Sequence, residues 1–403
     1  MSNLDLFSGV LDEKDILKSD EVIDPFLSDW RGTIKGKAQA VLCPRSTMQV
    51  SKILKIADEN NLVLVPQGGN TGLVGGGIPD RSGKAFVLCL RRMNQVRTFS
   101  CKNRSMTVEA GCILGDLKNL ALENELYFPL NLAARGSCTV GGNLSTNAGG
   151  INVLKYGSAR DLCLGIEVVL LGGEILNLLA PLRKDNTGYD LKHIFIGAEG
   201  TLGIITAASL KLFSLPNFRV TALVGIPDLS TGLDLLRLLQ KISNDQVEAF
   251  EIMSKSLFDV VFKHFPDINK PFDNTSELLI LMEVSSSQTR LIDQKIGDQV
   301  PLYTLMEDFL SEALEKNMVS DVILAYDDFQ REQLWKIREN AAEAQKRESS
   351  PVNTDISVTC DSLQEFYNLA TDAVRSMCSK TRICCYGHMG DGNLHFNLIE
   401  QDG

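Results

Sequence analysis

The chain has 403 residues, of which 40 are Lys or Arg and 51 are Asp or Glu, so its formal net charge at pH 7 is −11. Apolar residues make up 44% and charged residues 23% of the chain, ordinary values for a globular protein long enough to form two or three domains. The acidic excess argues against a large nucleic-acid-binding surface, and the sequence holds no run of about 18 apolar residues that would indicate a transmembrane helix.

Residues 1–36 form an acidic N-terminal segment with no Arg before Arg31. A signal or transit peptide needs a basic, acid-poor start, so we expect neither. The ten cysteines show no CxxC spacing, and several lie in apolar runs such as FVLCL at 86–90. This usage favours buried free thiols in a reducing compartment over disulfides or zinc ligation.

Short apolar strands alternate with helices in the first half of the chain. Ser46 and Gln49 form a capping box before apolar positions at helical spacing, so a helix is expected to begin there. A second helix is expected at 114–125. Strands are expected at 38–44, at 61–65 as a buried strand, at 85–90, at 106–111, and at 162–173 as a strand pair that ends in a turn.

The first glycine block, PQGGNTGLVGGGIP at 66–79, follows an expected strand. Six of the ten residues at 68–77 are Gly, which lets backbone N–H groups converge on an anion such as a pyrophosphate. The block contains neither GxGxxG nor GK[ST], so it is neither a Rossmann fingerprint nor a Walker loop. The alternative is a flexible surface loop.

Two further glycine blocks follow, ARGSCTVGGNLSTNAGG at 134–150 and FIGAEGTLGIIT at 195–206. The hydroxyl and amide side chains of the second block could bond a polar ring edge or a ribityl chain. Three such blocks beside apolar strands favour one extended ligand. A long dinucleotide with a flat ring fits them better than a small metabolite.

The second half of the chain is richer in periodic helices, expected at 229–243 and 327–347. A Pro-Asn break near 217 predicts a boundary between a domain at 37–216 and a domain at 217–403. A strand is expected at 277–284, and 382–388 and 393–399 are expected to form a hairpin around the Asp-Gly turn of MGDG. The chain ends at Gly403, soon after a core-like strand, which we interpret as a C-terminal truncation.

Three side chains of this half could carry chemistry. His388 and His395 flank the expected turn, where a hairpin can bring two imidazoles to one side at metal-ligand separation. Two histidines alone are weak evidence, because a metal site needs three or four ligands. Arg338 lies in the expected helix at 327–347, where an Arg is usually a solvated surface charge.

The three glycine blocks and the segment GHMGDGNLHFN at 387–397 closely resemble the vanillyl-alcohol-oxidase-type FAD-binding proteins. Within that family the chain is most similar to the D-2-hydroxyglutarate and D-lactate dehydrogenases. The resemblance runs from about residue 30 to the end. It implies an α+β, two-domain FAD-linked oxidase architecture, in which a glycine-loop FAD-binding domain precedes an antiparallel-sheet cap domain that covers the flavin and holds the substrate.

The resemblance also implies roles for particular residues. Arg338 would clamp a substrate carboxylate, Asn397 would contact the same end of the substrate, and His388 and His395 would bind a divalent metal, zinc first. FAD would be held without a covalent bond, because the first histidine is His193; Cys138 could form a cysteinyl link, but a packed thiol is the expectation. The implied FAD-binding residues are Pro66, Gly68, Gly69, Asn70, Thr71, Gly72, Gly75, Gly76, Gly136, Ser137, Gly141, Gly142, Asn143, Thr146, Asn147, Gly149, Gly150, Glu199, Gly200, Gly203 and Ile204.

The chain departs from the family in three places. Relatives continue past the GDGNLH segment to a Glu-His-Gly motif that completes the metal site and supplies the expected general base. Ala342 stands where the D-2-hydroxyglutarate dehydrogenases have a hydroxyl residue, and Asn353 stands where they have Lys. Both positions bear on how a second carboxylate is held.

The resemblance therefore implies FAD-dependent oxidation of a D-2-hydroxy acid, D-2-hydroxyglutarate to 2-oxoglutarate first. The alternatives are a D-lactate dehydrogenase, or a flavin-binding protein impaired by the absent motif. Electrons would leave through an acceptor protein of the electron transfer flavoprotein type. The family implies a mitochondrial location, and the lack of a presequence leaves a cytoplasmic one as the alternative.

Overall fold

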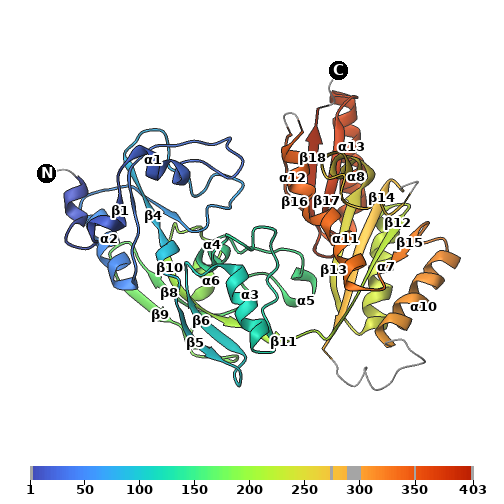
Figure 1. The fold of residues 1–403 in the computed structure, drawn as a ribbon, viewed down its shortest axis with the longest axis horizontal. Coiled ribbons are helices and arrows are strands. Elements are labelled where there is room, and N and C mark those ends of the chain that lie inside the picture. Colours follow the sequence, from blue (N-terminus) through green and yellow to red (C-terminus); the bar gives the residue numbers. More distant parts are fainter. Residues whose placement is uncertain (1–2, 273–275, 288–300, 349–350, 401–403) are drawn as a thin grey trace. The chain divides into compact units, whose positions relative to one another are not determined.

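The computed structural model describes residues 3–272, 276–287, 301–348 and 351–400 (Figure 1). The chain divides into two compact units. Unit 1 comprises Met1–Gly149 and Gly157–Leu215, and unit 2 comprises Gly150–Tyr156 and Pro216–Gly403. Within the described residues, no helix combines the length and the apolar character needed to cross a bilayer.

Unit 1 is built on a four-stranded and a five-stranded sheet. The first has the order β1-β2-β4-β3, with β2, β4 and β3 parallel and β1 antiparallel to β2. The second has the order β5-β6-β10-β8-β9 and is antiparallel throughout, and β7 pairs with β11 separately. The strands are β1 Ile16–Leu17, β2 Ala38–Leu42, β3 Leu64–Gln67, β4 Ala85–Cys89, β5 Val96–Ser100, β6 Ser105–Glu109, β7 Leu126–Tyr127, β8 Cys163–Val169, β9 Ile175–Leu178, β10 Ile204–Lys211 and β11 Phe213–Ser214.

The helix α2 (Thr47–Glu59) supplies much of the core of unit 1. The hydroxyl of Ser46 accepts the backbone N–H of Gln49 at 3.3 Å, so the predicted N-terminal cap is confirmed. The side-chain oxygen of Gln49 accepts the backbone N–H of Arg45 at 2.7 Å, whereas a capping box would have it accept the N–H of Ser46. The other helices of unit 1 are α1 Asp20–Ile23, α3 Leu114–Glu123, α4 Val140–Ser145 and α6 Lys192–Phe195.

Two expectations for unit 1 need correction. The strand expected at 61–65 begins only at Leu64 and is half-buried, because β3 lies at the edge of its sheet. The segment 162–173 holds one strand, β8, rather than a strand pair. Its antiparallel partner β9 follows the turn, with Val169 opposite Ile175. An apolar run predicts a strand but does not reveal whether the strand has one neighbour or two.

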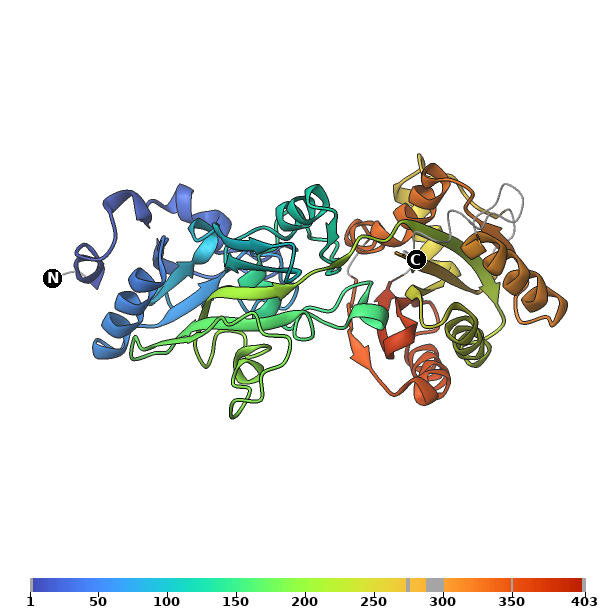
Figure 2. The same ribbon diagram turned by 90° about the horizontal axis from the view of Figure 1, so that it is seen from below.

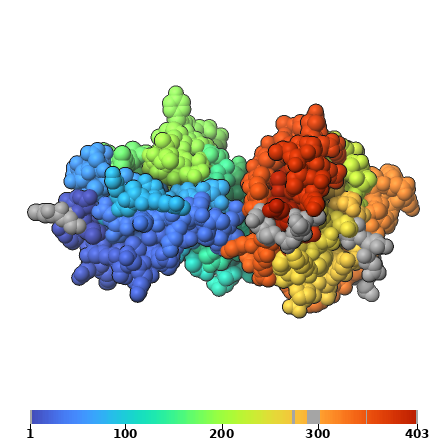
Figure 3. Space-filling view, turned by 90° about the horizontal axis from the view of Figure 1, so that it is seen from above, coloured from blue at the N-terminus to red at the C-terminus, as the bar shows by residue number. Residues whose placement is uncertain are grey.

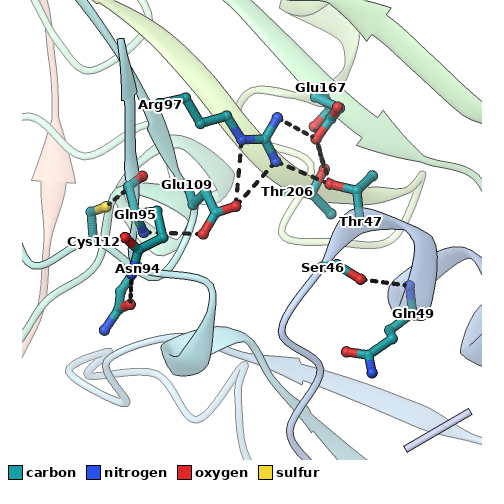
Figure 4. Close-up of polar contacts among 10 residues, drawn as sticks. All are labelled: Ser46, Thr47, Gln49, Asn94, Gln95, Arg97, Glu109, Cys112, Glu167 and Thr206. Carbon is teal, nitrogen blue, oxygen red and sulfur yellow. Dashed lines mark hydrogen bonds and ion pairs between the residues drawn. The ribbon is translucent and has the colours of Figure 1, made fainter. Parts of the chain in front are cut away.

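A polar network joins α2 to the second sheet (Figure 4). Arg97 of β5 contacts Glu109 at 3.4 Å and Glu167 at 3.1 Å, and Glu167 also accepts the hydroxyl of Thr206 at 2.8 Å and that of Thr47 at 2.6 Å. Both glutamates are buried. Because a buried carboxylate is costly without a partner, this network holds helix and strands in one register.

Unit 2 contains one seven-stranded sheet with the order β15-β12-β14-β13-β17-β18-β16, and every pair in it is antiparallel. This confirms the predicted α+β architecture with an antiparallel sheet in the second half. The strands are β12 Phe218–Ile226, β13 Val247–Ser254, β14 Leu278–Ser286, β15 Val322–Leu324, β16 Ile356–Ser357, β17 Arg382–His388 and β18 Asn393–Ile399.

Helices cover both faces of this sheet (Figure 2). One face packs against α7, α10 and α13, and the other packs against α8, α11 and α12. Glu251 of β13, Arg338 of α11 and Tyr386 of β17 meet on the second face. The helices are α7 Leu229–Ser243, α8 Lys255–His264, α10 Pro301–Glu315, α11 Asp328–Glu339, α12 Ala341–Lys346 and α13 Leu363–Met377.

Two expectations for unit 2 also need correction. The helix expected at 327–347 is divided at Asn340, whose side-chain N–H donates to the carbonyl of Lys336 at 2.8 Å, a local bond that competes with helix continuation. The connection after His388 is a short 3₁₀ turn, Met389–Asp391, closed by Gly392 at φ 77°, instead of a two-residue Asp-Gly turn. A Cβ on Gly392 would lie 2.0 Å from the carbonyl oxygen of Val358, so only glycine fits.

A short excursion of the chain belongs to unit 2 although unit 1 surrounds it in sequence. Residues Gly150–Tyr156, hereafter the strap, carry the helix α5 (Val153–Tyr156). The ammonium of Lys155 donates to the carbonyl and hydroxyl oxygens of Ser285, both at 2.8 Å, and to Gln246 at 3.1 Å. These bonds anchor the strap to β14 and to the turn before β13.

Candidate active site

The first glycine loop of unit 1 leaves its backbone donors unused. In the described part of the chain, no hydrogen bond is donated by a backbone N–H of residues 68–77. The carbonyls are held instead: Arg91 donates to Gly68 O at 3.0 Å and to Gly69 O at 2.7 Å, and Gln67 donates to Gly77 O at 2.8 Å. A run of free N–H groups over anchored carbonyls can receive an anion.

The three glycine blocks converge in unit 1. A Cβ on Gly69 would lie 2.3 Å from the carbonyl oxygen of Ser137, which places the first block directly against the second. The N–H of Glu199 donates to Ser145 O at 2.9 Å, and a Cβ on Gly200 would lie 2.6 Å from the ring of Pro66. The structure therefore brings together segments that lie far apart in the sequence.

The glycines of these blocks differ in what requires them. Gly69, Gly141 and Gly203 are required by neighbouring protein atoms, which a Cβ would approach within 2.3–2.7 Å. Gly72 and Gly136 have no protein atom within 4 Å of a built Cβ. At these open positions packing does not demand glycine, so they are the ones where a ligand could approach the backbone closely.

One buried hydroxyl at the junction of the first two blocks is unsatisfied within the described residues. Thr139 is 2% exposed, and its Oγ1 has no hydrogen-bond partner there. A Cβ on Gly68 would lie 2.3 Å from this oxygen. A buried polar atom without a partner costs free energy, so a bound polar ligand would stabilise this arrangement.

The N-terminal segment packs against the first glycine loop, a contact that the sequence analysis did not predict. Asn70, at φ 54°, donates its side-chain N–H to Ser28 O at 2.9 Å, and Gln67 donates to Phe26 O at 2.9 Å. A Cβ on Gly75 would lie 2.6 Å from the side chain of Ile34. No pattern in the sequence of residues 1–36 indicated this role.

Cys138, His193 and His264 contact other protein groups. Burial raises the pKa of the Cys138 thiol, which disfavours the thiolate needed for a covalent link, and the thiol accepts the side-chain N–H of Asn143 at 3.6 Å. His193 contacts Asp190 at 3.3 Å, and its carbonyl accepts from Arg160 at 2.8 Å. His264 lies 2.5 Å from Glu348 in unit 2.

A second polar centre lies in unit 2 around Glu251. This carboxylate is 1% exposed; one oxygen accepts from Arg338 Nε at 2.8 Å and the other lies 2.6 Å from His388 Nδ1. Burial alone would raise the pKa of Glu251, but His388 and Arg338 hold it below its ordinary value. Sequence reasoning missed Glu251, whose signal is an acidic residue inside the apolar run VEAFEIMS.

Arg338 itself is arranged to receive a ligand. It is 9% exposed, and the guanidinium carbon lies 4.8 Å from the centre of the Tyr386 ring. Only its Nε takes part in a hydrogen bond within the described residues, so both terminal NH₂ groups are available there. A buried guanidinium with two free parallel donors is suited to a carboxylate.

His388 and His395 lie on the neighbouring strands β17 and β18, with ring centroids 6.0 Å apart. Each ring faces a carboxylate through Nδ1: His388 contacts Glu251, and His395 lies 3.3 Å from Asp355. The hydrogen bond from His395 lowers the pKa of Asp355. Both Nε2 atoms are thus left for another partner, which is the orientation that metal-bound imidazoles adopt.

The donor set nevertheless falls short of a metal site. Among the residues that the structure describes, no group of three or more His, Cys, Asp or Glu side chains is arranged to hold a metal ion. Two imidazoles do not satisfy the three or four protein ligands that zinc takes. The residues present therefore do not by themselves fit a zinc ion.

Asn397 is engaged by the protein through both ends of its side-chain amide. It is 3% exposed; its side-chain N–H donates to Gln345 Oε1 at 2.9 Å and its oxygen accepts the N–H of Thr354 at 2.9 Å. These bonds hold the segment before β16 against α12. Substrate contact by Asn397 stays a prediction.

Other surface features of the chain contain none of the predicted site residues. A cavity of about 740 Å³ in unit 2 is lined by residues of α10, β15 and α11, including Leu310, Ile323 and Phe329, and by none of the predicted site residues. In unit 1 the segment between β9 and α6 stands on the surface, with Tyr189 93% exposed (Figure 3).

Comparison with known families matches both halves of the chain. Residues 38–179 match the FAD binding domain family, and residues 215–402 match the C-terminal domain of FAD linked oxidases. The first match contains the first two glycine blocks, and the second contains Glu251, Arg338, His388 and His395.

Curated relatives match almost the whole chain. The chain is 36% identical to the mitochondrial D-2-hydroxyglutarate dehydrogenase of Arabidopsis thaliana over 97% of its length and 67% of the relative's. It is 38% identical to the mitochondrial enzyme of that name from Bos taurus, over 96% of the chain and 68% of the relative. It is 34% identical to the D-2-hydroxyglutarate–pyruvate transhydrogenase of Saccharomyces cerevisiae, over 99% of the chain and 80% of the relative.

Solved structures share the fold. p-Cresol methylhydroxylase superposes with a TM-score of 0.77 at 14% identity, covering 99% of this chain and 82% of the other. Alkyldihydroxyacetonephosphate synthase superposes with a TM-score of 0.75 at 18% identity, covering 99% of this chain and 75% of the other. At these identities the likeness concerns architecture only.

Proposed function

The chain belongs to the family of FAD-linked oxidases that contains the D-2-hydroxyglutarate dehydrogenases, and on this premise we propose that it oxidises D-2-hydroxyglutarate to 2-oxoglutarate with FAD. The observation that carries the proposal is the buried Arg338, whose two terminal NH₂ groups are available within the described residues. Relatives of 36–38% identity act, by their names, on this acid.

FAD fits the geometry of unit 1. The unused N–H groups of the loop 68–77 suit its pyrophosphate, and the buried Thr139 hydroxyl suits one of its polar atoms. The open backbone at Gly72 and Gly136 would let the cofactor approach. Binding is non-covalent, since no histidine lies in the loop and burial keeps Cys138 a thiol.

When bound, FAD supplies the two-electron acceptor for oxidation of the hydroxyl carbon. The chain's own residues bind and orient the acid. Arg338 holds the substrate carboxylate with both NH₂ groups, while Glu251 and the Tyr386 ring hold the guanidinium in place. His388 keeps Nε2 free for the acid, because its Nδ1 is engaged by Glu251.

A divalent metal, zinc first, at His388 and His395 is a separate part of the proposal; it needs a ligand beyond these two imidazoles, and no step above depends on it. Elemental analysis of the purified protein measures it. The expected result is metal in the parent protein and less in the His388→Gln and His395→Gln variants.

A second candidate substrate is D-lactate. A relative from Schizosaccharomyces pombe, 37% identical over 93% of the chain, is named a putative D-lactate dehydrogenase. Ala342 and Asn353 lack the hydroxyl and ammonium groups that a second substrate carboxylate could use. A monocarboxylic acid would not need them.

The electron acceptor and the location complete the proposal. We propose transfer to a protein of the electron transfer flavoprotein type; pyruvate, which the name of the yeast relative contains, is the alternative to assay beside it. We propose a mitochondrial location because the plant and animal relatives carry it in their names.

The decisive experiment is the visible absorption spectrum of the purified chain, recorded anaerobically before and after each acid is added. A flavin band bleached by D-2-hydroxyglutarate but slowly or not at all by D-lactate is the expected result. Bleaching by D-lactate alone would mean that D-lactate, and not D-2-hydroxyglutarate, is the substrate. A band that neither acid changes would make the chain a flavin-binding protein without this activity, and the lack of any flavin band would reject the proposal.

A further inference from the structure

We infer that Glu251 is the positioning residue of the substrate site: its one carboxylate fixes the fork of Arg338 and the tautomer of His388 at the same time. The inference rests on the proposed function for its substrate readout, but its structural claim concerns only residues of unit 2. Three elements meet at this carboxylate, since Glu251 lies on β13, Arg338 on α11 and His388 at the end of β17.

The first argument is the division of the two oxygens. Oε2 accepts from Arg338 Nε at 2.8 Å, and Oε1 lies 2.6 Å from His388 Nδ1. A carboxylate accepts hydrogen bonds only, so Nδ1 of His388 must carry the proton. In the neutral form of the imidazole the lone pair is then at Nε2, on the side of the ring opposite Glu251.

The second argument is the choice of nitrogen on Arg338. Glu251 takes Nε and leaves both terminal NH₂ groups for a ligand. Because Nε is occupied, a carboxylate ligand can use only the end-on pair of NH₂ donors, which fixes its orientation. The Tyr386 ring, 4.8 Å from the guanidinium carbon, supports the fork from its face, so the guanidinium has two fixed neighbours.

The third argument is charge and burial. Glu251 is 1% exposed and bears the one carboxylate that contacts either of these two groups within the described residues. Its negative charge neutralises the buried guanidinium of Arg338 when no substrate carboxylate is bound. Asp355 serves His395 in a similar way at 3.3 Å, but it contacts no arginine there, so only Glu251 couples the clamp to an imidazole.

The test compares Glu251→Gln with the matched control Glu283→Gln. Glu283 is also buried, on the adjacent strand β14, and accepts from Thr221 Oγ1 at 2.6 Å and Trp335 Nε1 at 2.7 Å. A glutamine there keeps an acceptor oxygen for both donors. A glutamine at 251 has one acceptor for two donors; because the guanidinium cannot lose its proton, the oxygen should accept from Arg338 Nε and the NH₂ group should face His388 Nδ1, which then accepts it.

The first readout is ¹⁵N–¹H correlation of the imidazoles in protein freed of metal by a chelator, which needs neither flavin nor substrate and must resolve only four histidines. We expect His388 protonated at Nδ1 in the parent protein and in Glu283→Gln, and protonated at Nε2 in Glu251→Gln. The same His388 tautomer in all three proteins would overturn the inference.

The second readout is the dissociation constant of D-2-hydroxyglutarate, followed by perturbation of the flavin spectrum. Glu251→Gln is expected to weaken binding about 10- to 100-fold, the usual effect of losing a residue that orients a ligand-binding group. Glu283→Gln is expected to leave it unchanged. If the parent protein binds flavin but not this acid, the proposed substrate fails while the imidazole spectrum still decides the role of Glu251.

Glu251→Asp keeps the inference testable if the glutamine variant does not fold. Its carboxylate is one methylene shorter and cannot reach both partners without a shift of β13. We expect His388 to keep its Nδ1 proton or Arg338 to keep its affinity for the acid, with the other property lost. Retention of both properties would overturn the inference.

Discussion

Gly69 and Gly72 lie three residues apart in one loop but differ in their surroundings. A Cβ at 69 would lie 2.3 Å from the backbone oxygen of Ser137, whereas a Cβ at 72 has no protein atom within 4 Å. Gly69→Ala should therefore lower the melting temperature of unit 1 and release flavin, because backbone atoms cannot yield cheaply. Gly72→Ala should leave the melting temperature unchanged, so any flavin loss there reports contact with the cofactor itself. Equal melting temperatures for the two variants would contradict this account.

The clamp at Arg338 should not tolerate lysine. A lysine ammonium cannot bond Glu251 and present two parallel donors at once, so Arg338→Lys should lower kcat/KM for D-2-hydroxyglutarate about 100-fold, equivalent to about 3 kcal/mol. Arg331→Lys, on the same helix but directed to Glu283 at 3.9 Å, is the control and should stay near the parent value. A similar loss in both variants would mean that the helix, and not the fork, is responsible.

The family resemblance, and not residue identity alone, singled out part of this candidate site. Arg338, His388 and His395 were expected from resemblance, and the structure gathers the first two on Glu251. Glu251 itself was not expected, because its partners lie 87 and 137 residues further along the chain. A single sequence contains no signal for such distant pairs. The packing-required glycines were likewise indistinguishable from the open ones by sequence.

At the scale of elements, the turn at residues 29–34 packs on the glycine loop and is held by an ionisable side chain, Asp29. Asp29 accepts the N–H of Ile34 at 2.7 Å, and Ile34 packs over Gly75. Burial alone would raise the pKa of Asp29, but the N–H of Ile34 and the hydroxyl of Thr33 hold it below the ordinary value of 3.8. The ionised form is therefore favoured in the folded state.

The sign of the resulting pH dependence follows from this lowered pKa. The stabilisation by Asp29 is complete above pH 3.8 and is lost as the pH falls through the lowered value. Flavin retention in the parent protein should therefore exceed that in Asp29→Asn near neutral pH, and the difference should shrink below pH 3.8. Flavin fluorescence during acid titration of both proteins measures it, and a difference that is constant with pH would exclude the turn.

The positions of helices and strands along the chain were more predictable than the elements that each of them packs against. The cap at Ser46 and the helix 229–243 follow from local chemistry, and the structure has both. The edge position of β3 and the break at Asn340 depend on tertiary partners, which no local pattern encodes. Apolar periodicity therefore predicts which elements follow one another along the chain. The order of strands within a sheet and the burial of each strand depend on tertiary contacts that it does not predict.

At the scale of the whole molecule, the strap should couple to the stability of unit 2 and not to that of unit 1. Lys155→Met removes donors to Ser285 and Gln246 and should cost unit 2 about 1–3 kcal/mol. Lys241→Met, at an exposed position of α7, is the control and should have no effect. Calorimetry of the full chain measures both, and an unchanged unit 2 transition in Lys155→Met would refute the anchoring role.

The strap also means that the backbone passes from one unit to the other three times, after Gly149, after Tyr156 and after Leu215. A protease that cleaves once after Leu215 would therefore not release two independent pieces. The N-terminal fragment would keep seven of its own residues seated in the C-terminal one, and the nicked molecule should elute as a single species. For the same reason, fragments 1–215 and 216–403 produced separately should complement each other in solution, with residues 150–156 as the point of attachment.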